Sequence, residues 1–196
     1  FTNNVIGTLA ILAPGLLGAS VARAARARGV SARIIIWARR PEVRIALAEQ
    51  PWCDDVADTP EAAVAAARLV VVAPPVSRIP ELIERIASSL PRDAVVTDVG
   101  SVKADICRQA RAALADSPAA FVGAHPMAGS ARTGWANADP ELFVTRPCFV
   151  TPDEDTADPA VETVVRFWRD LGSEVVTIGA DAHDEIVAHI SHLPQI

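Results

Sequence analysis

Two short segments near the middle of the chain carry side chains that could transfer a proton. Residues 97–103 read TDVGSVK and residues 123–130 read GAHPMAGS, and each follows a short apolar run typical of a buried parallel strand. Open α/β sheets bind their ligands at the carboxyl ends of such strands. We therefore predict that Ser101 and His125 lie side by side at this edge of a sheet, where they can form a proton-transfer pair.

The elements that must position these residues alternate along the chain. Short β-branched runs are followed by longer amphipathic stretches, which is typical of βαβ units. This order predicts an α/β fold of the Rossmann type, a mostly parallel sheet with helices on both faces. The predicted strands are 6–13, 33–37, 69–73, 94–98, 119–124, 147–151 and 174–178. The predicted helices are 16–29, 41–50, 60–67, 78–89, 102–115 and 157–171.

After Gly179 the pattern becomes wholly helical. We therefore expect residues 1–179 to form a dinucleotide-binding domain. Residues 180–196 are expected to be the first helix of a second, helical domain whose remainder is absent. The 196 residues would then be the front of a longer protein, able to bind a cofactor and poor at turnover alone.

Composition excludes several classes of partner. With 18 Lys and Arg against 24 Asp and Glu, the net charge is −6 and no basic block is present, so we expect no nucleic acid partner. The longest apolar stretch, residues 69–76, is far shorter than the ~18–20 residues that span a bilayer, so we expect no membrane partner. Cys53, Cys107 and Cys148 are odd in number and widely spaced, which favours free thiols in a reducing cytoplasm.

A glycine-containing turn after the first predicted strand indicates a dinucleotide site. The dinucleotide fingerprint has glycine at its first, third and sixth positions, and Gly15 and Gly18 supply the last two. Ala13 replaces the first glycine, which a turn with negative φ would accept. The alternative is an ordinary strand-to-helix turn. The predicted cofactor-binding residues of this turn are Ala13, Pro14, Gly15, Leu16, Leu17 and Gly18.

The end of the second predicted strand bears on the choice of cofactor. Sites for NAD usually place Asp or Glu about 20 residues after the last glycine, to hold the ribose 2′-hydroxyl. Here that position is Ala38, and Arg39 and Arg40 follow it. Two guanidinium groups could bind a 2′-phosphate, although they could also be solvated arginines before a helix. We predict NADP as the cofactor, with NAD as the alternative.

Five segments in order resemble the prephenate and arogenate dehydrogenases of tyrosine biosynthesis: APGLLGAS, VVVAPPV, TDVGSVK, GAHPMAGS and HDEIVAHISHLP. The resemblance covers essentially the whole chain. It implies oxidative decarboxylation of prephenate or arogenate with hydride transfer to NAD(P), giving 4-hydroxyphenylpyruvate or tyrosine. It also implies a cytoplasmic homodimer, held together by a C-terminal helical domain that also serves the substrate site.

The resemblance assigns roles to individual residues. His125 matches the catalytic histidine, which takes the proton of the substrate hydroxyl, and Ser101 matches the serine that orients this histidine beside the nicotinamide. The residues expected to line the cofactor groove after the strand at 69–73 are Pro74, Pro75 and Val76. The residues expected to contact substrate are Ser130, His183, Asp184, His192 and Gln195.

Several positions have alternative interpretations. Ser130 could be a turn serine, and Gln195 replaces a histidine of many relatives, which leaves the choice of prephenate or arogenate open. Glu185, His189 and His192 share a helix face and could bind a metal, but the family needs none and we predict none.

Two residues of the TDVGSVK segment and the overall activity also have more than one interpretation. Lys103 could face phosphate or water, and Asp98 could do no more than fix its loop. The rival functions are a dehydrogenase of the β-hydroxyacid or imine reductase type, and a non-catalytic NAD(P)-binding module.

Overall fold

The computed structural model of the chain describes residues 5–192, with side chains described for residues 5–189. Its centre is a six-stranded sheet in the order β3-β2-β1-β4-β5-β6, and every neighbouring pair is parallel. The strands are β1 (Ile6–Leu12), β2 (Ser31–Trp37), β3 (Asp55–Val56), β4 (Leu69–Val72), β5 (Val95–Asp98) and β6 (Ala120–Phe121). This parallel order confirms the Rossmann-type fold.

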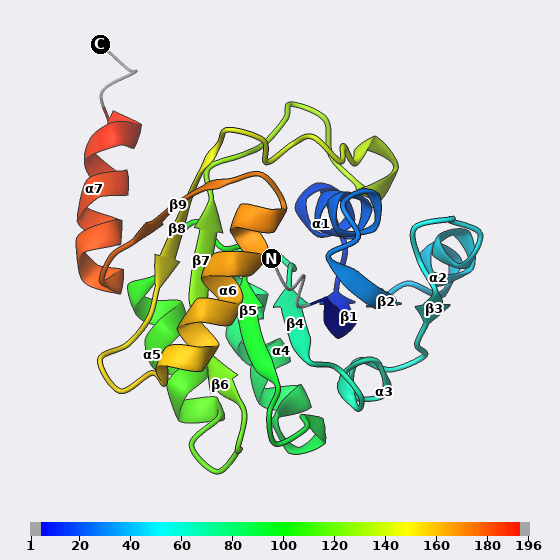
Figure 1. Cartoon of the computed structure of the whole chain (residues 1–196), viewed down its shortest axis with the longest axis horizontal. Helices are drawn as coiled ribbons and strands as arrows, with labels where there is room; N and C mark the ends of the chain where they lie inside the picture. The colour runs from blue at the N-terminus through cyan, green and yellow to red at the C-terminus, as the bar shows by residue number, and fades with distance from the viewer. Residues whose placement is uncertain (1–4, 193–196) are drawn as a thin grey trace.

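Helices cover both faces of this sheet (Figure 1). One hydrophobic core lies under α1 (Leu16–Ala27), α2 (Pro41–Ala48) and α6 (Asp158–Asp170). The other lies under α3 (Pro60–Val64), α4 (Ile79–Ile86) and α5 (Ala104–Ala113). β4 is a continuous run of apolar residues, and all four residues of β5 are buried, because a parallel strand between two helical layers is buried on both faces.

Helix boundaries follow local chemistry. The Thr59 side chain accepts a hydrogen bond from the Ala62 N–H at 3.2 Å, and Pro60 occupies the first position of α3, as the sequence predicts. Short 3₁₀ turns, η1 (Val76–Arg78) and η2 (Ala87–Ser89), flank α4. They explain why the predicted helix 78–89 is longer than the α-helix itself.

A second, three-stranded sheet departs from the prediction. It contains β7 (Gly123–Pro126), β8 (Pro147–Thr151) and β9 (Glu174–Thr177), with β7 antiparallel to β8 and β8 parallel to β9. The single strand predicted at 119–124 is therefore wrong. The chain leaves the first sheet after β6 and joins the second at β7.

Gly123 marks this change of sheet. A Cβ at this position would lie 2.4 Å from the Thr151 Oγ1 and 2.9 Å from the Cys107 Sγ, so the backbone passes too close to β8 and α5 for any side chain. His125 consequently lies within β7, not in a loop after a strand as expected.

The last helix, α7 (Ala180–His192), lies beside α5 and β8 at one end of the molecule (Figure 1). That residues 180–196 begin a second domain stays a prediction. Among the described residues, no helix is both long and apolar enough to cross a membrane.

Candidate active site

The turn after β1 adopts a backbone that the sequence analysis did not foresee. Ala13 has φ of 57°, so the negative φ expected for it is wrong. The first fingerprint position needs a left-handed backbone, which glycine adopts freely and which costs an L-residue roughly 1–2 kcal/mol. Ala13 therefore holds a strained backbone at the position where the fingerprint has glycine.

The two remaining fingerprint glycines have different surroundings. A Cβ on Gly18 would lie 2.9 Å from the Ala73 Cβ and 3.3 Å from the Ile11 Cγ2, so α1 packs closely on β1 and β4 only because this residue is glycine. The same atom on Gly15 would meet nothing within 4 Å. Gly15 thus leaves open space at the amino end of α1, where N–H groups and the helix dipole favour an anion.

Two adjoining clefts open at the carboxyl edge of β1, β2 and β4. The larger, of about 320 Å³, is lined by Ala13, Trp37, Arg39, Pro74, Pro75, Arg78, Glu81, Leu82 and Arg85. The smaller, of about 210 Å³, is lined by Ala13, Pro14, Gly15, Ala38, Arg39, Arg40, Val43, Gly134 and Trp135. They share Ala13 and Arg39, so they can form one groove across the point where the strand order reverses, the usual place of a dinucleotide.

Gly134 and Trp135 line the smaller cleft, which sequence reasoning did not foresee. They lie in the connection between β7 and β8, residues 127–146, which we call the strap. Its 3₁₀ turn η3 (Trp135–Asn137) packs beside α1. No local pattern links a residue of the strap to the fingerprint turn more than 100 residues earlier. A Gly-Trp pair in a polar loop was the one available signal.

Polar contacts fasten the strap to α1. The Asp139 N–H donates to the Ser20 Oγ at 2.9 Å, and the Arg23 guanidinium donates to the Ala138 carbonyl. Arg28 and Glu141 form an ion pair at 3.0 Å between Nη2 and Oε2. The strap therefore joins the strand of His125 to the helix that begins at the cleft.

His125 and two residues of α7 form a hydrogen-bonded row. The His125 Nδ1 lies 2.9 Å from the His183 Nε2, and the His183 Nδ1 lies 2.7 Å from the Asp184 Oδ1. The Asp184 carboxylate accepts bonds from the N–H groups of Lys103, at 2.8 Å, and Ala104, at 3.0 Å, at the start of α5. In Figure 1 the lower end of α7, where the helix begins, lies next to α5, as this contact requires.

The surroundings of this row favour an uncharged His125 at one end and an ionised Asp184 at the other. Burial, the neighbouring His183 and the Lys103 ammonium lower the pKa of His125 to about 4, against a smaller opposing effect of Asp184. Although partial burial raises the pKa of Asp184, hydrogen bonds from Ala104 and His183 bring it below its usual range. At neutral pH His125 is therefore an uncharged imidazole and Asp184 is a carboxylate.

Beneath this row lies a buried ion pair. Lys103 and Asp98 are fully buried, and the Lys103 ammonium donates to the Asp98 carboxylate and, at 2.9 Å, to the Ala124 carbonyl. Asp98 also accepts from the N–H groups of Gly100 and Ala124, at 2.8 and 3.0 Å. The expectation that Lys103 faces phosphate or water is wrong, whereas Asp98 fixes its loop as expected. The pair also joins the end of β5 to the residue before His125.

Residues 21–177, more than half of the chain, match the family described as "Prephenate dehydrogenase, nucleotide-binding domain". The chain belongs to this family. The match confirms the resemblance found in the sequence, and it agrees with a parallel sheet whose fingerprint turn opens on a groove.

Three relatives place the chain within the prephenate dehydrogenase family. It is 30% identical over 188 residues to the cyclohexadienyl dehydrogenase of Zymomonas mobilis, across 96% of this chain and 64% of that protein. Its fold superposes on the prephenate dehydrogenase of A. aeolicus in complex with hydroxyphenyl propionate and NAD+ with a TM-score of 0.88, at 26% identity, covering 96% of this chain and 65% of that one. The arogenate dehydrogenase of Synechocystis gives a TM-score of 0.87 at 30% identity, covering 95% and 65%. The chain thus spans just under two thirds of each relative.

Most predicted cofactor residues of this prephenate dehydrogenase domain line the clefts, and Leu16, Leu17, Gly18 and Val76 are outside both linings. Gly18 provides helix packing, and Leu17 and Val76 pack against the hydrophobic cores. Leu16 begins α1. The predicted residues that line a cleft are Ala13, Pro14, Gly15, Arg39, Arg40, Pro74 and Pro75.

The predicted catalytic and substrate residues are distributed less evenly. Ser101 is exposed in the loop after β5, and among the described residues the bonded partner of His125 is His183. Ser130 is exposed, and its Oγ accepts from the Arg132 N–H at 3.2 Å, as a turn serine would. The side chain of His192, and Gln195 entirely, lie outside the described residues. Within residues 5–189 no three His, Cys, Asp or Glu side chains are arranged to hold a metal ion.

Proposed function

We propose that this chain binds NAD(P) and supplies the proton acceptor of an enzyme that oxidatively decarboxylates prephenate, arogenate or both. The observation that carries this proposal is the uncharged, almost buried His125, held on β7 by the ion pair at the end of β5. The nicotinamide half of a dinucleotide would extend from the groove toward this end of β5. Ser101 would then lie at the nicotinamide, on the exposed loop after β5.

The groove suits the cofactor by its own chemistry. Gly15 offers open space at a helix amino terminus for the pyrophosphate, and Pro74 and Pro75 form an apolar wall beyond β4. When bound, the nicotinamide would accept the hydride. The residues of the chain then orient the two reactants and handle the proton.

His125 acts on the substrate hydroxyl. It accepts the hydroxyl proton as hydride leaves the same carbon, and the electrons of the bond to the departing ring carboxylate complete the aromatic ring, with release of carbon dioxide. His125 then returns its proton to the oxygen of the phenolic product, so no net proton is consumed. A neutral imidazole is the form that can begin this sequence.

Family membership favours this reaction over that of the β-hydroxyacid dehydrogenases and imine reductases. An ordered row of His125, His183 and Asp184 favours an enzyme over a non-catalytic binding module, which needs no such base. Ser130, His192 and Gln195 are proposed to contact substrate. A helical domain that begins near residue 180, and a second copy of the chain, are proposed to complete the substrate pocket.

An assay with both substrates and both cofactors tests the proposal. The natural full-length polypeptide should reduce NAD(P) in the presence of prephenate or arogenate and release carbon dioxide in equal amount. Reduction without carbon dioxide release would indicate another dehydrogenase. Cofactor binding with no turnover of either substrate would indicate a binding module.

We also propose NADP as the preferred cofactor, because Ala38 leaves no carboxylate at the ribose and Arg39 and Arg40 line the smaller cleft. Replacing both arginines with alanine should weaken NADP binding by about 1.5–3 kcal/mol, the scale of hydrogen bonds to a charged group. Binding of NAD should change little, since it lacks the 2′-phosphate. Titration calorimetry with each cofactor measures both effects.

Arg33→Ala is the matched control. Arg33 lies nearer the amino end of β2, outside both clefts, and it is exposed and paired with Asp55 at 2.8 Å. This variant should bind both cofactors normally. Equal affinity of the unmutated protein for NADP and NAD would exclude the proposed preference.

A further inference from the structure

His183 and Asp184, two adjacent residues of α7, continue the hydrogen-bonded row from His125, the proposed base. The His183 side chain has no exposed surface and is enclosed by His125 on one side and by the Phe149 ring, at 5.2 Å between centroids, on another. The His183 side chain therefore offers no exposed atom to a substrate in this structure. Its hydrogen bonds point to a different role.

Hydrogen-bond complementarity fixes the protons along the row. Ionised Asp184 can only accept, so the His183 Nδ1 must carry the hydrogen that lies between them at 2.7 Å. A neutral His183 then has its lone pair on Nε2. The His125 Nδ1, 2.9 Å away, must in turn donate to it. The lone pair of neutral His125 is thereby left on Nε2.

The opposite arrangement is disfavoured by the surrounding charges. If His183 were an imidazolium it would donate to His125, whose Nε2 would then carry a hydrogen and could accept nothing. The Lys103 ammonium, which already lowers the pKa of His125, is a positive charge close by. Asp184 is the one acidic group bonded to His183, and Asp98 is bonded to Lys103.

We propose that His183 and Asp184 are positioning residues, which hold His125 in the tautomer whose Nε2 can accept the proton of the substrate. Asp184 is itself held by the N–H groups of Lys103 and Ala104, so the start of α5 orients the base through two residues of α7. The effect on catalysis rests on the proposed function. The tautomer of His125 does not depend on that function, because it follows from hydrogen bonds in the protein without substrate.

The tautomer can be measured directly. In the natural full-length polypeptide labelled with ¹⁵N-histidine, nitrogen chemical shifts near neutral pH should show both His125 and His183 protonated on Nδ1 and bare on Nε2. Asp184 need not be altered for this measurement, so folding of a variant is not at issue. A His125 protonated on Nε2 would overturn the proposal.

Kinetics of two substitutions test the consequence. His183→Leu removes the acceptor and should lower kcat by roughly 10- to 100-fold, part of the ~10²–10⁴-fold that a positioned base contributes, with KM for NAD(P) unchanged. His183→Gln can place a carbonyl oxygen near the former Nε2 and should recover most of the rate. The His125 nitrogen spectrum should show mixed tautomers in the leucine variant and one tautomer in the glutamine variant.

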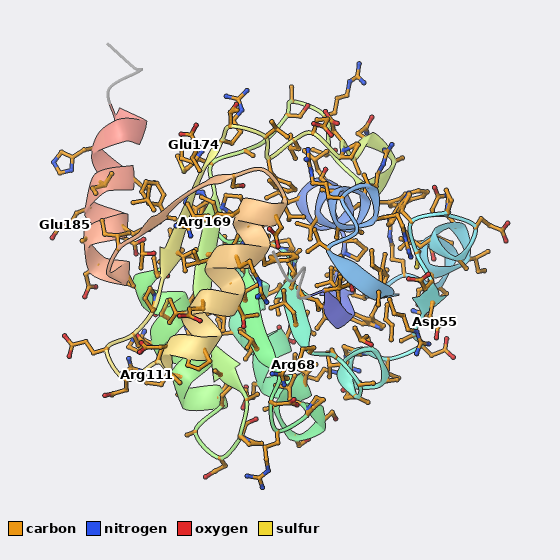
Figure 2. All side chains as sticks on the ribbon, in the orientation of Figure 1. Asp55, Arg68, Arg111, Arg169, Glu174 and Glu185 are labelled. Carbon is orange, nitrogen blue, oxygen red and sulfur yellow. The ribbon has the colours of Figure 1, made fainter. Side chains whose placement is uncertain are left out.

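The same substitution at His189 is the control. His189 is exposed four residues after Glu185, which Figure 2 shows on the outer side of α7, and its Nδ1 lies 2.7 Å from the Glu185 carbonyl. His189→Leu should leave both kcat and the His125 spectrum unchanged. Equal rates for His183→Leu and the unmutated protein would refute the positioning role. If the unmutated protein turns over neither substrate, the proposed function fails and the tautomer alone decides this inference.

Discussion

Asparagine in place of His125 should lower kcat for prephenate or arogenate by about 10²–10⁴-fold, the contribution of a positioned general base. An amide of asparagine can keep the hydrogen bond to His183 but cannot accept a proton. His125 lies on β7, away from the residues that line the clefts, so the dissociation constant of NAD(P) should be unchanged. Steady-state rates and a fluorescence titration of the cofactor measure the two quantities. A near-normal rate would remove His125 from the mechanism.

The pH dependence of the unmutated protein gives an independent check on His125. The base works when neutral, so activity is present above its pKa and is lost as pH falls through it. Because burial, His183 and Lys103 lower that pKa to about 4, the acidic limb of kcat/KM, which reports the substrate-free enzyme, should be displaced toward pH 4. An ordinary exposed histidine would place the limb near its reference pKa of about 6.5. A limb there would contradict a buried base.

Most helices and strands of this fold can be predicted from the sequence. Alternating apolar runs give the order of strands and helices, and capping residues such as Thr59 mark a helix start within one residue. β3 was missed because its two residues, Asp55 and Val56, are too few to show a pattern. The second sheet was missed because β6 and β7 are both short and only Val122 separates them, so together they resemble one strand. Only packing against β8 tells them apart.

The site is harder to predict, because its residues contact partners that lie far away in the sequence. The motifs locate His125 and the fingerprint turn, and the matched family region, residues 21–177, includes His125. The contact between His183 and His125 spans 58 residues, and that between Asp184 and Lys103 spans 81. Neither periodicity nor spacing encodes such pairs.

Charge was also a misleading guide at Lys103. A lysine after a serine in a loop suggests a phosphate ligand or a solvated side chain, yet Lys103 is buried, and Arg39 and Arg40 are the cations that line the groove. A third cavity is lined by Arg111, which Figure 2 labels, and by Asp153, and these two side chains form an ion pair. This cavity shares no lining residue with the two clefts of the groove. The position of a cation in the fold, more than its presence in a motif, decides what it binds.

Replacing Lys103 with methionine should lower the free energy of unfolding by about 3–5 kcal/mol, the cost of leaving one partner of a buried ion pair without its counter-charge. Asp98 would keep its bonds from Gly100 and Ala124 but would stay a buried carboxylate with no cation. The Ala124 carbonyl would also lose a donor, so the strand that carries His125 would be held less firmly. Urea denaturation of the natural full-length polypeptide measures the loss.

Arg108→Met, in the helix α5 that follows Lys103, is the control for a Lys or Arg replaced by methionine in this part of the chain. Arg108 pairs with Asp105 at the surface, and such exposed pairs contribute about 0–1 kcal/mol, so this variant should unfold close to the unmutated protein. A loss of stability of this size can prevent the Lys103→Met protein from folding. If the Arg108→Met protein folds normally, that outcome also supports the prediction. Similar stability of the two variants would mean that the buried pair adds little, and that β7 is held to β5 by its backbone and apolar contacts. In that case kcat of Lys103→Met should be normal as well, because the position of His125 would not depend on the lysine.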